Sequence, residues 1–250
     1  MIVYSYIYFF PEVIMEKLLN AKNLPWTVLA AGILGFILAL LHSALGGNFL
    51  YTLLWMLTAA TAALLVWRTW DLKQAPKYSF NFPPSLIGAA GAAAAAAGIL
   101  ISTIVKMFSH FDTLSMLDIF LGLVATAAML FLSHCRWKGR HPSIIFHTVI
   151  CIYLMVDMVC IYRLRSSDPQ VWKYCFSLLA SVAILLSCYY NAAFAANAGD
   201  RKKHTLSHLS AVYLCLLSLP VTENPVFYLT MAAWAFTNLC NLSPMPRGTR

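Results

Sequence analysis

Charged residues are scarce in this chain of 250 residues. Asp, Glu, Lys and Arg make up only 10% of it, whereas hydrophobic residues make up 61%. A soluble domain carries about 25% charged residues, so the composition excludes a single globular domain in water. The apolar runs are continuous and do not alternate as the strands of a membrane β-barrel do. Since only helices and closed barrels satisfy every backbone group in lipid, the sequence predicts an all-α, polytopic transmembrane bundle.

Recognisable catalytic and metal-binding motifs are also missing. The sequence has no GxSxG elbow, no HExxH pair and no GxxxxGK[ST] phosphate loop. No CxxC pair is present, and most of the seven cysteines lie in apolar runs, where they are expected to be free thiols packed as small apolar groups. We therefore expect no enzyme activity, no cofactor and no metal ion.

The net charge of +8 does not indicate a nucleic-acid partner, because the basic residues follow a membrane pattern. If the amino terminus is placed inside, 13 of the 17 Lys and Arg residues fall in the inner segments, which are the two termini and alternate loops. Basic loops of membrane proteins face the cytoplasm and its anionic lipids. The pattern predicts cytoplasmic amino and carboxyl termini, a lipid bilayer as the main partner, and a multi-pass protein of the bacterial cytoplasmic (plasma) membrane.

Eight apolar stretches are long enough to cross a hydrocarbon core of ~30 Å. We expect spans over residues 26–45, 49–67, 84–107, 114–134, 143–162, 171–196, 206–221 and 226–242. They form one transmembrane domain, residues 26–242, which is followed by a cytoplasmic tail, residues 243–250. Residues 1–25 are expected to form a cytoplasmic or interfacial segment, and Met15 is an alternative translation start.

The third predicted span contains the run GAAGAAAAAAG. Its residues Gly91 and Gly98 are seven positions apart and therefore share one helix face. Small residues allow helices to approach closely in a membrane. The run predicts a central, tightly packed helix; the alternative is a smooth wall of a narrow cavity or a sliding interface.

Two carboxylates, Asp118 and Asp157, fall inside predicted spans, near the outer ends of the fourth and fifth. Ionisable groups in a membrane are costly and are usually functional. Tyr153 shares a face with Asp157, and Lys106 ends the third span. One hypothesis is an outward-opening pocket for a substrate or ion, with candidate residues Asp157, Asp118, Tyr153 and Lys106 and a rim of Arg163 and Arg165. The alternative is that Asp157 pairs with Lys106 or an arginine and only fixes the helix register.

A second polar set lies near the inner ends of the spans. His204 and His208 are four positions apart, but His204 follows the basic segment GDRKK and is expected to be solvated. With no carboxylate or third ligand nearby in sequence, this histidine pair does not predict a metal site. The set consists of His134, His147, Tyr189, Tyr190, Asn191, His208, Asn238 and Asn241.

One stretch resembles uncharacterised polytopic membrane proteins of clostridial-type anaerobic bacteria. The resemblance covers about a third of the chain and implies a membrane fold and location, with no assigned activity. Within it, Asp168 is expected to cap a helix that begins at Pro169. The residues that carry the resemblance are Arg163, Asp168-Pro169, Trp172, Tyr174, Tyr189-Tyr190 and Phe194.

These features favour small-molecule transport, or a substrate-binding membrane component, as the function. In a proton-coupled transporter, Asp157 is expected to be the protonated group. The alternative function is a non-catalytic partner subunit or membrane sensor, which associates with another membrane protein or with copies of itself. A membrane-embedded enzyme is the third hypothesis.

Overall fold

The computed structural model describes residues 23–46, 48–70, 72, 76–109, 113–165 and 172–242. Over these residues the chain is helical and contains no strand, which confirms the predicted all-α class. Met15, most of the predicted segment 1–25, the tail 243–250 and the turn Asp168-Pro169 lie outside the described residues. The helices are α2 (Leu24–Leu45), α3 (Asn48–Trp70), α4 (Tyr78–Asn81), α5 (Leu86–Ser109), α6 (Thr113–Lys138), α7 (Ile144–Arg165), α8 (Trp172–Ala195), α9 (Arg201–Ser218) and α10 (Pro225–Cys240).

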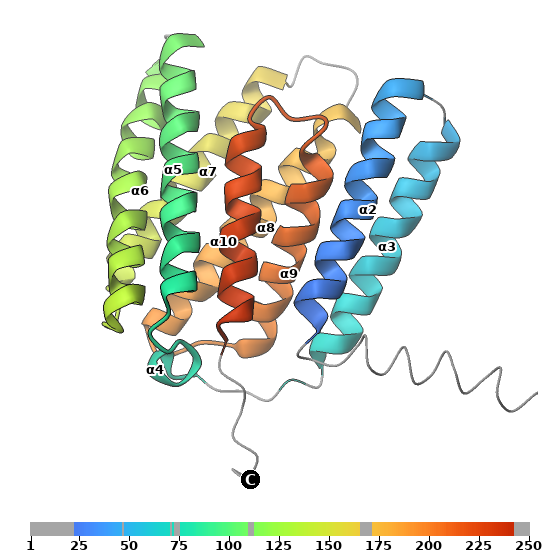
Figure 1. Cartoon of the computed structure of the whole chain (residues 1–250). Helices are drawn as coiled ribbons and strands as arrows, with labels where there is room; N and C mark the ends of the chain where they lie inside the picture. The colour runs from blue at the N-terminus through green and yellow to red at the C-terminus, as the bar shows by residue number, and fades with distance from the viewer. Residues whose placement is uncertain are drawn as a thin grey trace, which may run out of the picture.

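Six of these helices, α2, α3 and α5 to α8, are long and apolar enough to cross a membrane. The chain therefore has the character of a multi-pass membrane protein. Helices α9 and α10 are shorter, with 18 and 16 residues, but they run beside the other long helices (Figure 1).

Two helix ends differ from the predicted spans by more than three residues. Helix α6 continues past His134 to Lys138, and α9 begins at Arg201, five positions before the predicted start. Asp200 explains the early start of α9, because its carboxylate accepts hydrogen bonds from the backbone N–H groups of Lys202 and Lys203 and so caps the helix. As a result, basic residues that the sequence pattern assigned to loops lie inside helices.

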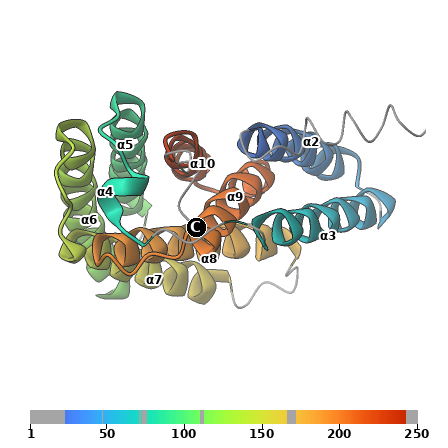
Figure 2. The ribbon, with the colours of Figure 1, turned by 90° about the horizontal axis from the view of Figure 1, so that it is seen from below.

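Six helices, α5 to α10, form a closed ring. Each packs on the next in chain order, and α10 returns to pack on α5. Figure 2 shows this ring from the end at which the short helix α4 lies. We call this the α4 end and the opposite one the far end. Residues that face the interior of the ring can therefore be followed from one end of the bundle to the other.

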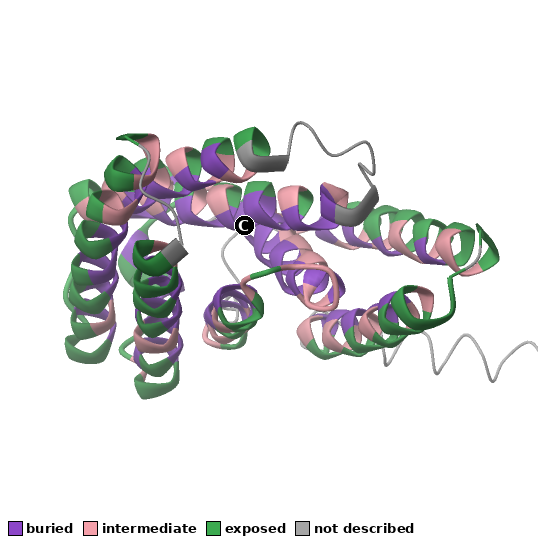
Figure 3. Cartoon of the chain, turned by 90° about the horizontal axis from the view of Figure 1, so that it is seen from above, coloured by how far each residue is buried: buried purple, intermediate pink, exposed green. Residues whose placement is uncertain are grey.

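The hairpin of α2 and α3 packs on the outside of the ring, against α9. Helix α9 is thus covered by α8, α10, α2 and α3, and most of its residues are buried (Figure 3). This position explains its polar sequence, because a helix that faces other helices on all sides does not need the apolar surface that lipid requires. In contrast, large apolar side chains of α2 and α3 point outward.

The small residues of α5 allow close contact with α10, which confirms the predicted tight packing. A methyl group at Gly91 would lie 2.8 Å from Thr237 Cβ, and one at Gly98 would lie 2.8 Å from Thr230 Cβ. The two threonines are seven positions apart on α10, as the two glycines are on α5. Each threonine hydroxyl also donates a hydrogen bond to its own helix, so no unpaired polar group remains at the contact.

Candidate functional site

At the far end of the ring, one lysine holds two carboxylates. Lys106 Nζ of α5 lies 2.6 Å from Asp118 Oδ2 of α6 and also contacts Asp157 Oδ1 of α7. The carboxylate side chains are only 2% and 5% exposed, and the lysine side chain is 20% exposed. The ammonium also lies 5.7 Å from the ring centre of Tyr153. The cluster joins three consecutive helices of the ring.

The formal charges of this cluster do not balance. Two carboxylates face one ammonium, so one negative charge is in excess when all three groups are ionised. Asp118 Oδ1 is buried and has no hydrogen-bond partner among the described residues. Buried charges are costly unless they are paired, so the cluster has a physical reason to bind one further proton or cation.

The structure brings four of the six predicted pocket residues together: Lys106, Asp118, Tyr153 and Asp157. The Arg163 side chain is exposed near the end of α7, and the Arg165 side chain lies outside the described part. The pairing of Asp157 with Lys106 agrees with the alternative, structural interpretation. Binding of a substrate or ion by this cluster stays a prediction.

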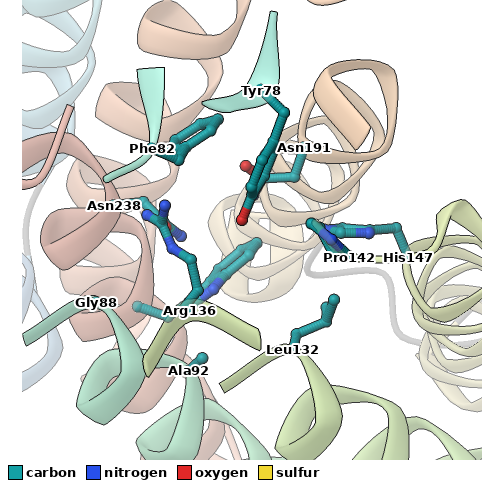
Figure 4. A pocket seen from close by; sticks show the side chains of 11 residues that line it. Tyr78, Phe82, Gly88, Ala92, Leu132, Arg136, Pro142, His147, Asn191 and Asn238 are labelled. Carbon is teal, nitrogen blue, oxygen red and sulfur yellow. The ribbon is translucent and has the colours of Figure 1, made fainter. Parts of the chain in front are cut away.

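A second cluster lies at the α4 end, around a cavity of ≈ 30 Å³ inside the ring. Figure 4 shows that side chains from several helices point into it, with Tyr78 and Phe82 above and Leu132 and Ala92 below. The cavity is lined by Tyr78, Phe82, Gly88, Ala92, Leu132, Arg136, Pro142, His147, Asn191, Trp234 and Asn238.

Arg136 is the one lysine or arginine of this lining. Its Nη2 donates a hydrogen bond to Asn238 Oδ1 at 2.9 Å, and its guanidinium carbon lies 4.4 Å from the ring centre of Phe82. Arg136 is only 8% exposed. Its Nη1 and the Nδ2 of Asn238 are buried without hydrogen-bond partners in the described part of the chain. The predicted span ends at residue 134 and leaves Arg136 in an inner basic loop, but the structure buries Arg136 within α6.

Behind the cavity, two histidines and an asparagine form a hydrogen-bonded chain. His204 Nε2 donates to Asn191 Oδ1 at 3.0 Å, and Asn191 Nδ2 donates to His208 Nε2 at 3.2 Å. His208 Nδ1 in turn donates to the His204 carbonyl at 2.9 Å. The amide orientation thus assigns one proton to each imidazole. His204 is fully buried, so the prediction that it is solvated was wrong.

Helix α4 and the residue after it cover the cavity at its α4 end. The Tyr78 N–H donates to Asn197 Oδ1, and Arg201 Nη1 donates to Asn81 Oδ1, which holds α4 against the ring. Burial raises the pKa of the Tyr78 phenol, and this effect outweighs the lowering effect of the nearby Arg136 charge. Because a phenol is already neutral at physiological pH, Tyr78 presents a hydroxyl to the cavity.

Of the second polar set, the structure gathers four residues in and behind the cavity: His147, Asn191, His208 and Asn238. The others do not line the cavity: His134 and Tyr189 are exposed, and Asn241 lies beside Gly88. Sequence reasoning missed Arg136, Tyr78, Phe82 and Trp234.

A signal for Arg136 was nevertheless present in the sequence. The buried face of α6 continues at spacings of three and four from the intramembrane Asp118 to Arg136. The two residues are 18 positions apart, which corresponds to ~27 Å along a helix. The same face of α6 therefore contributes to both clusters. Its buried residues in this register are Asp118, Gly122, Ala125, Met129, Leu132 and Arg136.

Within the described residues, no group of three or more His, Cys, Asp or Glu side chains could hold a metal ion. Comparison of the chain with protein families, with curated proteins and with solved structures finds no match. The two clusters are therefore the features of the chain that bear on its function.

Proposed function

We propose that this chain is a transporter of a small molecule, with its path inside the ring of α5 to α10. The observation that carries the proposal is the arrangement of polar clusters at opposite ends of one ring. The cluster of Lys106, Asp118 and Asp157 lies at the far end, and the Arg136 cavity lies at the α4 end. Ionisable residues in membrane segments commonly mark substrate and ion pathways.

The far-end cluster is the proposed coupling site. One proton on either carboxylate removes the excess negative charge and leaves a neutral pair with Lys106. Protonation of Asp157 would also weaken the ion pair that ties α7 to Lys106 of α5. A change of protonation is thereby linked to the packing of adjacent helices, which is what a proton-coupled transporter requires.

The proposed topology has eight spans with both termini in the cytoplasm, in a bacterial cytoplasmic membrane. Two features support α9 and α10 as spans: they run beside the six apolar helices (Figure 1), and α9 is shielded from lipid by its neighbours. An even number of crossings agrees with Leu24 and Cys240 at the same end of the bundle. That end also contains the basic residues Lys138, Arg140 and Lys203, as expected of a cytoplasmic side.

The first test is whether water reaches the far-end cluster. Asp157→Cys is made in a background without the native cysteines and is exposed to a membrane-impermeant thiol reagent on right-side-out vesicles. Labelling from outside is expected, because a coupling site must exchange protons with water. Arg163→Cys, at the exposed end of α7, is the positive control, and Val159→Cys, on an exposed apolar face of the same helix, is the negative control.

Complete protection of position 157, with normal labelling at position 163, would contradict the proposed path. The cluster would then be a sealed ion pair that fixes helix register, and the partner-subunit function would be favoured. Each cysteine variant must elute as a single species in mild detergent, so that exposure caused by unfolding is not counted as access.

A further inference from the structure

The cavity at the α4 end contains a buried positive charge with no negative partner. Arg136 forms no ion pair with any carboxylate that the structure describes, and no Asp or Glu belongs to the cavity lining. A guanidinium carries five N–H donors and stays charged in proteins. Arg136 uses Nη2 for Asn238, while Nη1 remains buried without a partner.

A second buried donor beside the cavity also lacks an acceptor. Asn238 turns its oxygen toward Arg136, so its Nδ2 amide is a buried donor without a described partner. Tyr78 adds a hydroxyl at the covered end of the cavity, where it interacts with the Arg136 side chain. Buried polar groups in native proteins are normally satisfied. What this cavity requires is therefore a compact group with several acceptor atoms and negative charge.

We propose that this cavity binds an oxyanion group, a carboxylate or a phosphate, with Arg136 as its charged ligand and Asn238 as a second donor. The planar fork of arginine matches the paired oxygens of both groups. Stacking on Phe82 holds the guanidinium plane in place before the anion arrives.

The volume of the cavity limits which part of a ligand can bind inside it. About 30 Å³ is enough for the anionic end of a molecule, since a single water needs ~10–15 Å³ by the same measure. The rest of a larger ligand must extend beyond the cavity. The oxyanion can come from a soluble metabolite or from a lipid headgroup, because both offer the same chemistry.

Binding at this cavity does not depend on the proposed transport, and its test is separate. The purified protein in phosphatidylcholine nanodiscs is titrated with sodium phosphate, sodium acetate and, at equal ionic strength, sodium chloride. The midpoint of thermal unfolding and the heat of binding are recorded. A saturable rise in the midpoint with phosphate or acetate, beyond that with chloride, is expected.

Two variants assign the effect to the cavity. Arg136→Gln should weaken oxyanion binding roughly 10- to 100-fold, because it removes a charged donor. Asn238→Asp supplies a carboxylate beside Arg136, so it should raise the unfolding midpoint without ligand and abolish the response to phosphate and acetate. The second variant keeps the test decisive if Arg136→Gln does not fold.

A lipid source is tested with the same proteins in phosphatidylglycerol nanodiscs. A higher midpoint there than in zwitterionic phosphatidylcholine, lost in Asn238→Asp, identifies an anionic lipid headgroup as the bound group. The proposal is overturned if neither phosphate, acetate nor phosphatidylglycerol has an effect. It is also overturned if both variants respond as the unmodified protein does, since the effect then arises elsewhere.

Discussion

Replacing Lys106 with Met is expected to destabilise the protein by about 3–5 kcal/mol, the usual cost of leaving a buried charge without its partner. The substitution removes the only described cation that contacts both Asp118 and Asp157, whose side chains are 2% and 5% exposed. Two buried carboxylates then remain side by side without compensation. The measurement is the free energy of unfolding in mixed detergent micelles, or the thermal midpoint where unfolding is irreversible.

Two comparisons make this expectation specific to the cluster. Asp157→Asn should cost much less than Lys106→Met, because it leaves Lys106 and Asp118 as a neutral pair. Lys203→Met is the matched control: Lys203 pairs with Asp200 at 3.6 Å, but its side chain is 62% exposed. Such surface pairs contribute about 0–1 kcal/mol. The combination of Lys106→Met with Asp118→Asn and Asp157→Asn should recover much of the loss, since no buried charge remains.

Equal stability of Lys106→Met and Lys203→Met would show that the far-end cluster is not held by charge. The excess negative charge would then not affect the free energy of unfolding, and the coupling role proposed for Asp157 would lose its basis. A large loss in Asp157→Asn, comparable to that of Lys106→Met, would instead indicate that the Asp157 contact itself stabilises the helices.

The spanning helices could be predicted because the signal for them is local. A stretch of about 20 apolar residues must cross the membrane as a helix, and the predicted spans agree with the helices to within a few residues over most of the chain. The two larger errors, at Lys138 and Arg201, have one cause. A basic residue beside an apolar run indicates a loop, unless tertiary contacts bury it, and those contacts come from distant parts of the chain.

The two candidate sites differ in how far the sequence could reveal them. Asp118 and Asp157 stand out because a carboxylate within an apolar run is rare. The Arg136 cavity is assembled from six helices, the α6–α7 connection and the residue after α4. Its aromatic cover, Tyr78 and Phe82, lies in a polar linker without any membrane signal. Only the spacing along α6, from Asp118 to Arg136, connects the two sites within the sequence.

Replacing Gly98 with Leu is expected to separate α5 from α10 and to destabilise the bundle by about 1–3 kcal/mol, the usual cost of overpacking. Even the first carbon of the new side chain would lie 1.8 Å from Thr230 Oγ1 and 2.8 Å from Thr230 Cβ. Thr230 Cβ is attached to the backbone, so rotating the hydroxyl does not remove the clash. Ala97→Leu, on the neighbouring exposed position, is the matched control and should have little effect in lipid.

A pair of substitutions tests whether the contact between position 98 and Thr230 causes the loss of stability. In Gly98→Ala the added methyl meets Thr230, whereas in Gly98→Ala with Thr230→Gly the opposing carbon is removed, so the double variant should be more stable than Gly98→Ala alone. Thermal unfolding in the same nanodiscs measures both. Helix association in lipid depends on close packing because lipid tails are as apolar as the side chains.

If Gly98→Leu and Ala97→Leu unfold at the same temperature, α10 does not pack on this face of α5. The ring would then be open between these two helices, and the Arg136 cavity would lack the α10 wall that supplies Asn238 and Trp234.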